Sequence, residues 1–132
     1  AREPVYYMNI TNLLNEYTYN QNARFNLYVR NKYWSPTIYT KANENPPTTT
    51  IQSASYRVLR TVDNLEVIPH NTGSDYATGL SYDVSGNYFN LDMSLLEPGY
   101  EYGIKLAFYD SHRQSWIEQD QKFLFRVEDY EY

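Results

Sequence analysis

The stretch Leu91-Asp-Met-Ser-Leu-Leu-Glu-Pro-Gly-Tyr-Glu-Tyr-Gly-Ile-Lys-Leu-Ala-Phe108 has the most regular pattern in the chain. Apolar and polar side chains alternate on both sides of a central proline and glycine. The apolar positions are Phe89, Leu91 and Met93 before the turn, and Tyr100, Tyr102, Ile104, Leu106 and Phe108 after it. A period of two places alternate side chains on one face of a β-strand. The stretch therefore predicts two strands with apolar faces that the rest of the chain must cover.

The turn Glu97-Pro98-Gly99 lies between these two strands. Proline fixes its own φ and glycine tolerates a positive φ, so the pair suits a sharp change of direction. We expect a corner here, at which the chain passes from one sheet to another.

The same alternation recurs along the chain. Strands are expected over the ranges 5–10, 24–30, 51–62, 65–68, 80–84 and 116–128, with a short edge piece at 37–40. Residues 12–22 are expected to form a polar connection, and Asp63-Asn64 a tight turn within a hairpin. The two long final strands should pair as an antiparallel hairpin. Apolar residues at helical spacing do not persist over three turns, so little or no helix is expected.

About seven or eight short strands separated by turn signals are typical of an antiparallel two-sheet sandwich. The sequence therefore predicts the all-β class. A length of 132 residues suits a single domain over the whole of 1–132, since a chain of this size buries about two-thirds of its unfolded surface. The sequence starts at Ala1 without an initiator methionine, so we expect a processed chain or a segment of a longer polypeptide.

Composition excludes several classes of function. The chain has no cysteine, which excludes disulfides and thiolate metal sites and favours a reducing compartment. Its formal net charge is −5 and its pI is near 4.9, and the basic residues are dispersed, so nucleic acid is not an expected partner. No apolar run approaches the roughly 20 residues of a membrane helix, so no membrane contact is expected.

The sequence holds few groups for catalysis or metal binding. His70 and His112 both lie in polar turns, far apart in the chain and without metal-ligand spacing. The segment 79–83 approaches a nucleophile elbow but lacks its final glycine and precedes a strand. The aspartates near loops, at positions 75, 83, 92 and 110, lack the Asp-x-Asp-x-Asp spacing of a calcium loop. We expect no catalytic residue, no cofactor and no metal.

Aromatic residues are the unusual feature, with sixteen tyrosines in an otherwise polar chain. Tyr33, Trp34 and Tyr39 flank a proline-containing break, and Trp116 follows a loop. If they project outward, they could anchor a protein interface or stack on sugars. The alternative is that both tryptophans fill the ends of the core.

Leu96-x-Pro98-Gly99-x-x-Tyr102 resembles the signature that leads into strand F of fibronectin type III and similar immunoglobulin-like sandwiches. The resemblance implies an immunoglobulin-like sandwich in which Tyr102 is the tyrosine-corner residue. Its ring would lie in the core, and its hydroxyl would bond to backbone just upstream. The alternative is an unrelated β-turn with a core tyrosine.

Three stretches together resemble a module in structural proteins of tailed bacteriophages. They are Trp34-Ser-Pro-Thr-Ile-Tyr-Thr-Lys-Ala, the segment from Leu80 to Glu97, and Phe123-Leu-Phe-Arg-Val-Glu, and the likeness runs from about Val5 to Glu128. The resemblance implies a non-enzymatic structural or docking module in a virion assembled in the host cytoplasm. Its partners would be other virion proteins, in a symmetric assembly of many copies. A carbohydrate- or receptor-binding module that uses Tyr33, Trp34 and Trp116 as a stacking platform is the alternative.

Overall fold

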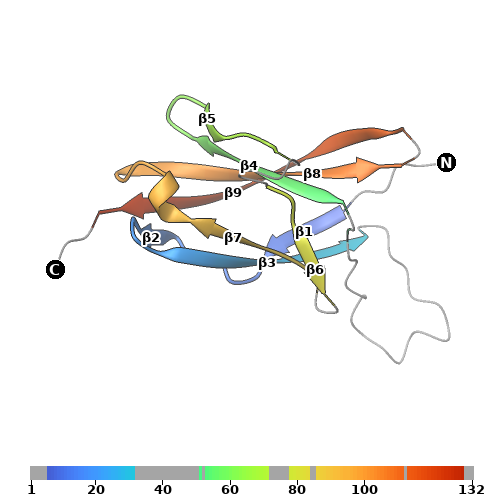
Figure 1. Cartoon of the computed structure of the whole chain (residues 1–132), viewed down its shortest axis with the longest axis horizontal. Coiled ribbons are helices and arrows are strands. Elements are labelled where there is room, and N and C mark those ends of the chain that lie inside the picture. Colours follow the sequence, from blue (N-terminus) through green and yellow to red (C-terminus); the bar gives the residue numbers. More distant parts are fainter. Residues whose placement is uncertain are drawn as a thin grey trace.

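The computed structural model describes residues 6–31, 51, 53–71, 78–83, 86–111 and 113–129. These residues form nine strands and one short 3-10 helix. The strands lie in two sheets, of four and five strands, that pack face to face (Figure 1). The predicted all-β two-sheet sandwich is confirmed. The described strands exceed the expected seven or eight, and the expected edge piece at 37–40 lies outside the described residues.

The smaller sheet has the order β1-β3-β7-β6, and all its pairs are antiparallel. Its strands are β1 (Tyr6–Ile10), β3 (Asn22–Asn31), β7 (Gly86–Asp92) and β6 (Ser81–Asp83). In the pairing of β3 with β7, Phe25 lies opposite Phe89. The predicted alternation therefore aligns the apolar faces of these two strands.

The larger sheet has the order β2-β9-β8-β4-β5. Its strands are β2 (Glu16–Thr18), β9 (Ser115–Glu128), β8 (Tyr100–Asp110), β4 (Ala54–Arg60) and β5 (Leu65–Ile68). The predicted antiparallel pairing of the two long final strands is confirmed in β8 and β9. The predicted hairpin of β4 and β5 is also present. In contrast, β2 pairs with β9 in parallel.

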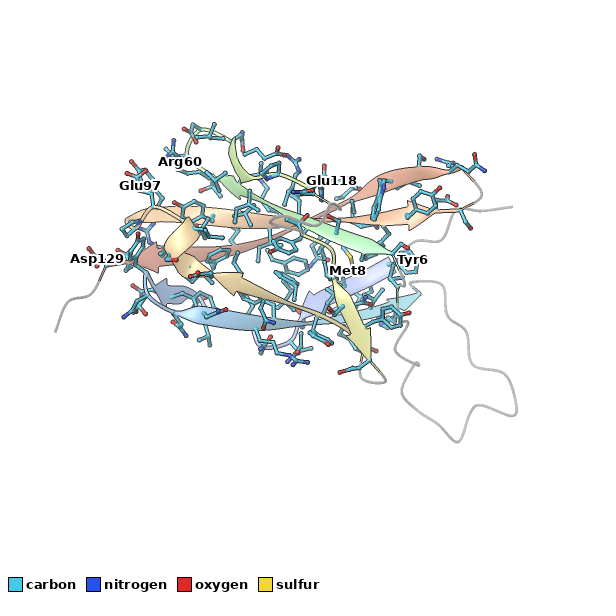
Figure 2. All side chains as sticks on the ribbon, viewed as in Figure 1. Tyr6, Met8, Arg60, Glu97, Glu118 and Asp129 are labelled. Carbon is cyan, nitrogen blue, oxygen red and sulfur yellow. The ribbon has the colours of Figure 1, made fainter. Side chains whose placement is uncertain are left out.

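The core lies between the sheets and is rich in aromatic rings. Tyr56 of β4 stacks on Phe89 of β7 with 4.3 Å between ring centroids, which joins the two sheets. Met8 also lies in this layer, whereas Glu118 lies on the outside of the larger sheet (Figure 2). The largest fully buried side chains include Phe25, Leu91, Met93, Leu96, Tyr102, Ile104, Leu106 and Phe125. Full burial of each contributes about 1.5–3 kcal/mol.

The corner between β7 and β8 carries the chain from the smaller sheet to the larger one, as predicted. The expected alternation through Met93 and Ser94 is wrong at its end, because β7 stops at Asp92 and a 3-10 helix, η1 (Met93–Leu95), follows. The Asp92 carboxylate accepts hydrogen bonds from the backbone N–H of Ser94 at 3.0 Å and from its hydroxyl at 2.7 Å. This local cap favours a helical turn over continued strand.

The strand β2 was not predicted, because residues 12–22 were expected to be a polar connection. Its middle residue, Tyr17, is buried, and its ring packs edge-on against Phe25 and Phe125. The Tyr17 hydroxyl accepts a hydrogen bond from the Leu14 N–H at 2.9 Å. Three residues are too few to show alternation, so Tyr17 was the sequence feature that could have indicated this strand.

The segment 80–84 also differs from the expected alternation. Leu80 is buried, but Tyr82 is exposed on the edge strand β6. Residues before β6 still belong beside the larger sheet, since Gly79 bridges to Ser55 and the Leu80 N–H donates to the Ala54 carbonyl. The chain then crosses to the smaller sheet, and this crossing interrupts the alternation.

A bulge divides the β8–β9 hairpin. Lys105 pairs with Lys122, but Ala107 pairs with Glu118, so residues 119–121 lie opposite Leu106 alone. Extra residues in one strand bend it and increase its twist. The far part of the hairpin lies at the end of the sandwich away from the corner (Figure 1).

Candidate functional site

The predicted corner residues come together between β7 and β8. Tyr102 is fully buried, and its hydroxyl donates to the Glu97 carbonyl at 2.5 Å, the geometry that the sequence resemblance implied. Burial raises the pKa of Tyr102. Leu96 is buried, and Gly99, which follows Pro98, has a φ of 92° and donates its N–H to the Val127 carbonyl. These residues fix the connection between the sheets.

Of the predicted surface aromatics, Trp116 is the one in the described part of the chain, and Tyr33, Trp34 and Tyr39 lie outside it. Trp116 lies near the start of β9 on the outer face of the larger sheet and is 44% exposed. The alternative that it fills the core is therefore wrong. The ring of Tyr109 packs edge-on against it, with 5.6 Å between centroids.

The outer face of the smaller sheet carries tyrosine, arginine and asparagine. Because strand residues alternate between faces, the neighbours of the core residues in β1, β3 and β7 point outward. We call this surface the tyrosine–arginine face. It comprises Tyr7, Asn9, Asn22, Arg24, Asn26, Tyr28, Arg30, Tyr88, Asn90 and Asp92.

Two arginines hold tyrosine rings on this face. The Arg24 guanidinium lies 3.9 Å from the centre of the Tyr88 ring, and that of Arg30 lies 4.7 Å from the centre of the Tyr7 ring. Each exposed cation–π contact contributes about 0.5–1 kcal/mol. A guanidinium carries several N–H groups that can bind carboxylates or carbonyls of a partner. In Arg24, one of them, Nε–H, donates to Asn26 Oδ1 at 3.3 Å.

The charge of the tyrosine–arginine face differs from that of the whole chain. The chain carries a net charge of −5, whereas this face carries Arg24 and Arg30 against a single acid on its own strands, Asp92 at the end of β7. Asp83 of the neighbouring β6 lies 3.9 Å from Arg24, at the border of the face. Tyrosine and arginine are enriched at protein interfaces, and lysine, aspartate and glutamate are depleted there. This face thus shares its tyrosine and arginine content with protein interfaces.

A small cavity lies on the outer face of the other sheet. It has a volume of about 280 Å³ and is lined by Ser55, His70, Ala107 and Trp116, and we call it the Trp116 pocket. Ser55 on β4 pairs with Ala107 on β8, which pairs with Glu118 on β9. Ala107 has a short side chain and lies between Ser55 and Glu118, so a cavity remains over it.

Hydrogen bonds fix the imidazole in this pocket. The Ser55 hydroxyl is bonded to His70 Nδ1 at 2.9 Å and to the Thr78 hydroxyl at 2.9 Å. The Thr78 hydroxyl in turn accepts from the Asn71 N–H at 2.7 Å. With Nδ1 bonded to Ser55, the other ring nitrogen of His70, Nε2, lies on the side of Glu118, 3.8 Å from Glu118 Oε1.

An ion-pair chain fixes the carboxylate beside the pocket. Arg57 binds both oxygens of Glu118, at 2.5 Å and 3.1 Å, and also reaches Glu66 at 3.0 Å. The hydrogen bond from Arg57 is the main reason that the pKa of Glu118 lies below its ordinary value. The carboxylate is therefore ionised at neutral pH and held by a planar two-point contact.

Ser55, His70 and Glu118 do not form the hydrogen-bonded chain of a serine hydrolase. The distance of 3.8 Å from His70 Nε2 to Glu118 Oε1 is too long for a hydrogen bond. Ser55 is buried, and its hydroxyl is shared between His70 and Thr78, so the hydroxyl is not free to attack a substrate carbonyl. The pocket therefore holds a fixed imidazole beside an indole, with the fixed Glu118 carboxylate 3.8 Å from that imidazole.

The described residues hold no group of three or more histidines, aspartates or glutamates placed to bind one metal ion. Among the expected loop residues, Asp75 and His112 lie outside the described part. No helix of the described residues has the length and apolar character needed to cross a membrane.

Sequence reasoning missed the Trp116 pocket except for its tryptophan. The contacts that form it join residues 15 to 61 positions apart, as in Ser55 with His70 and Arg57 with Glu118. The outward-facing Arg57 in the middle of β4 was the sequence feature that could have indicated this site.

Comparisons of this chain with models of protein families, with curated proteins and with solved structures find no match.

Proposed function

We propose that this chain is a non-enzymatic, immunoglobulin-like structural module of a tailed-phage virion, which docks onto neighbouring virion proteins through its tyrosine-bearing faces and edge strands. The observation that carries the docking role is the tyrosine–arginine face. It is a continuous surface across β1, β3 and β7 that shares its tyrosine and arginine content with protein interfaces.

The strand order supports the immunoglobulin-like assignment. If the strands are lettered in chain order with β2 as an added piece A′, the smaller sheet reads A-B-E-D and the larger one C′-C-F-G-A′. Immunoglobulin-like sandwiches divide their strands in this way. Tyr102 then lies near the start of strand F and bonds back to Glu97, as a tyrosine corner does.

The sequence resemblance supports the virion assignment. Two of the three stretches that carry it lie on described elements: the segment 80–97 covers β6, β7 and η1, and 123–128 forms the end of β9. Both stretches supply core residues, among them Phe89, Leu91 and Phe125. The likeness therefore concerns the part of the sequence that builds the sandwich, and the third stretch, 34–42, lies outside the described residues.

The docking mechanism follows from the chemistry of the face. Tyrosine rings supply contact area with few rotors to freeze, and the stacked arginines hold two of them in place before binding. The arginine N–H groups favour a partner surface with carboxylates or exposed carbonyls. In a symmetric particle, each contact can be weak because many copies bind together.

Hydroxyl-radical footprinting on the intact particle and on the isolated chain tests this proposal. We expect Tyr7, Tyr28 and Tyr88 to be oxidised in the isolated chain and protected in the particle. Tyr109, which is exposed on the other sheet, is the internal control for general shielding. Equal oxidation of the three tyrosines in both samples would overturn the docking role of this face.

A matched pair of variants links the footprint to assembly. Tyr7→Ser with Arg30→Ser removes one stacked pair from the tyrosine–arginine face. Leu65→Ser with Leu124→Ser removes exposed apolar side chains from the other sheet. We expect the first double variant to lower incorporation into particles at least tenfold while it folds normally by circular dichroism. Equal incorporation of the two double variants contradicts the proposal.

A further inference from the structure

We propose that the Trp116 pocket binds one pyranose ring of a neutral glycan. The pocket lies on the opposite sheet from the tyrosine–arginine face, so this activity is additional to docking and does not depend on it. The inference rests on a cavity of about 280 Å³ lined by an exposed indole and a fixed imidazole, with the fixed Glu118 carboxylate 3.8 Å from that imidazole.

The aromatic wall suits the apolar face of a sugar. Pyranose rings present axial C–H groups on one side, and these pack favourably on the electron-rich face of an indole. Trp116 is 44% exposed, and Tyr109 packs edge-on against its ring and holds it in place. The ring is therefore accessible and ordered before a ligand arrives, which lowers the entropy lost on binding.

The polar side of the pocket suits sugar hydroxyls. His70 Nε2 and Glu118 Oε1 are 3.8 Å apart, too far to bond directly and close enough for one hydroxyl to contact both. When the Ser55 hydroxyl donates to His70 Nδ1, Nε2 carries a proton that it can donate to a sugar oxygen. The sugar hydroxyl that accepts this hydrogen bond can donate its own proton to the Glu118 carboxylate, which Arg57 holds in place.

Size and charge narrow the ligand. Small-molecule sites commonly span about 300–1,000 Å³, so the pocket volume of about 280 Å³ fits one ring and leaves the rest of a glycan outside. Around it, the charges of Arg57 and Lys105 are balanced by those of Glu66 and Glu118. An acidic sugar would bring a second carboxylate toward Glu118, whereas a neutral one brings none. A neutral hexose is therefore favoured over sialic or uronic acids.

The test uses the whole chain on an array of neutral and sialylated oligosaccharides. Hits are followed by saturation-transfer NMR with the methyl glycosides of glucose, galactose and mannose. We expect saturable binding of at least one neutral glycan and none that requires a sialic acid. No neutral glycan bound on the array, or binding of sialylated glycans alone, would overturn the proposal.

Variants assign binding to the pocket. Trp116→Ala and Glu118→Gln should each weaken neutral-glycan binding at least tenfold, and Leu124→Ala, an exposed position on the same sheet, should leave it unchanged. Circular dichroism confirms that each variant folds. Undiminished binding by Trp116→Ala overturns the assignment. Footprinting gives a separate outcome, because protection of Trp116 in the intact particle would mean that a protein covers the pocket and that the glycan role is wrong.

Discussion

Replacement of Tyr102 by phenylalanine removes one hydroxyl from the corner and leaves the buried ring. In the native structure, the hydroxyl donates to the Glu97 carbonyl at 2.5 Å, and the ring stacks near Phe125 with 6.0 Å between centroids. Because phenylalanine retains the ring, packing in the core is retained as well. Tyr102→Phe therefore isolates the hydrogen bond that joins β8 to the turn before it.

The magnitude follows from what this bond contributes. A typical intramolecular hydrogen bond contributes about 0.5–1.5 kcal/mol, and a polar group left without its partner costs about 1–3 kcal/mol. We therefore expect Tyr102→Phe to lower the free energy of unfolding by about 1–2 kcal/mol. For a domain of this size, that loss corresponds to a fall in Tm of about 3–8 °C.

Equilibrium unfolding in urea, followed by far-UV circular dichroism, measures this loss. The midpoint should fall while the m-value stays constant, since the surface exposed on unfolding does not change. Tyr7→Phe is the matched control, because that tyrosine is exposed on the outer face of the smaller sheet, and its effect should stay within about 0.5 kcal/mol. Equal stabilities for the two variants would refute the reasoning about the corner.

Three further predictions concern stability. Gly99→Ala should lower the free energy of unfolding by about 1–2 kcal/mol, because a φ of 92° at this position strains any side chain. Gly79→Ala is the control and should lower it less, since the new Cβ there meets only ordinary contacts. Thermal melts of the two variants measure the difference. The lowered pKa of Glu118 adds stability that is present above its ordinary value of 4.5 and is lost as pH falls through the folded-state value. In a plot of the unfolding midpoint against pH, Glu118→Gln should therefore show a smaller fall at acid pH than the native chain. An equal fall in both proteins contradicts this prediction. Leu91→Asp should prevent folding because it buries an unpaired charge, while Leu124→Asp on the exposed face should fold, and circular dichroism separates the two.

The sequence was sufficient for the core and for the corner. Phe25, Leu91 and Ile104 are almost completely buried, because alternation over long strands determines which face is covered. The passage from β7 to β8 was predicted from the proline and glycine, since those residues restrict the backbone locally. Both inferences used information carried by neighbouring residues.

The remaining features depend on contacts between distant residues. The strand β2 has three residues and gains its order from β9, more than a hundred positions later. The Trp116 pocket needs β4, β8 and β9 to align in one register, and the bulge at residues 119–121 shifts that register. No pattern within a single segment predicts a spatial meeting of this kind, so Trp116 alone was identified from the sequence.

The parallel pairing of β2 with β9 has a mechanical consequence. Tension applied through the two ends of the chain would draw these adjacent strands past each other along their length. Their bonds, including those from the Tyr19 N–H to the Glu128 carbonyl and from the Arg126 N–H to the Asn15 carbonyl, would then carry the load together. An antiparallel pair pulled from one end opens bond by bond instead. Once β1, which precedes β2 in the chain, has been pulled from β3, we expect the β2–β9 pair to resist further stretching as a unit.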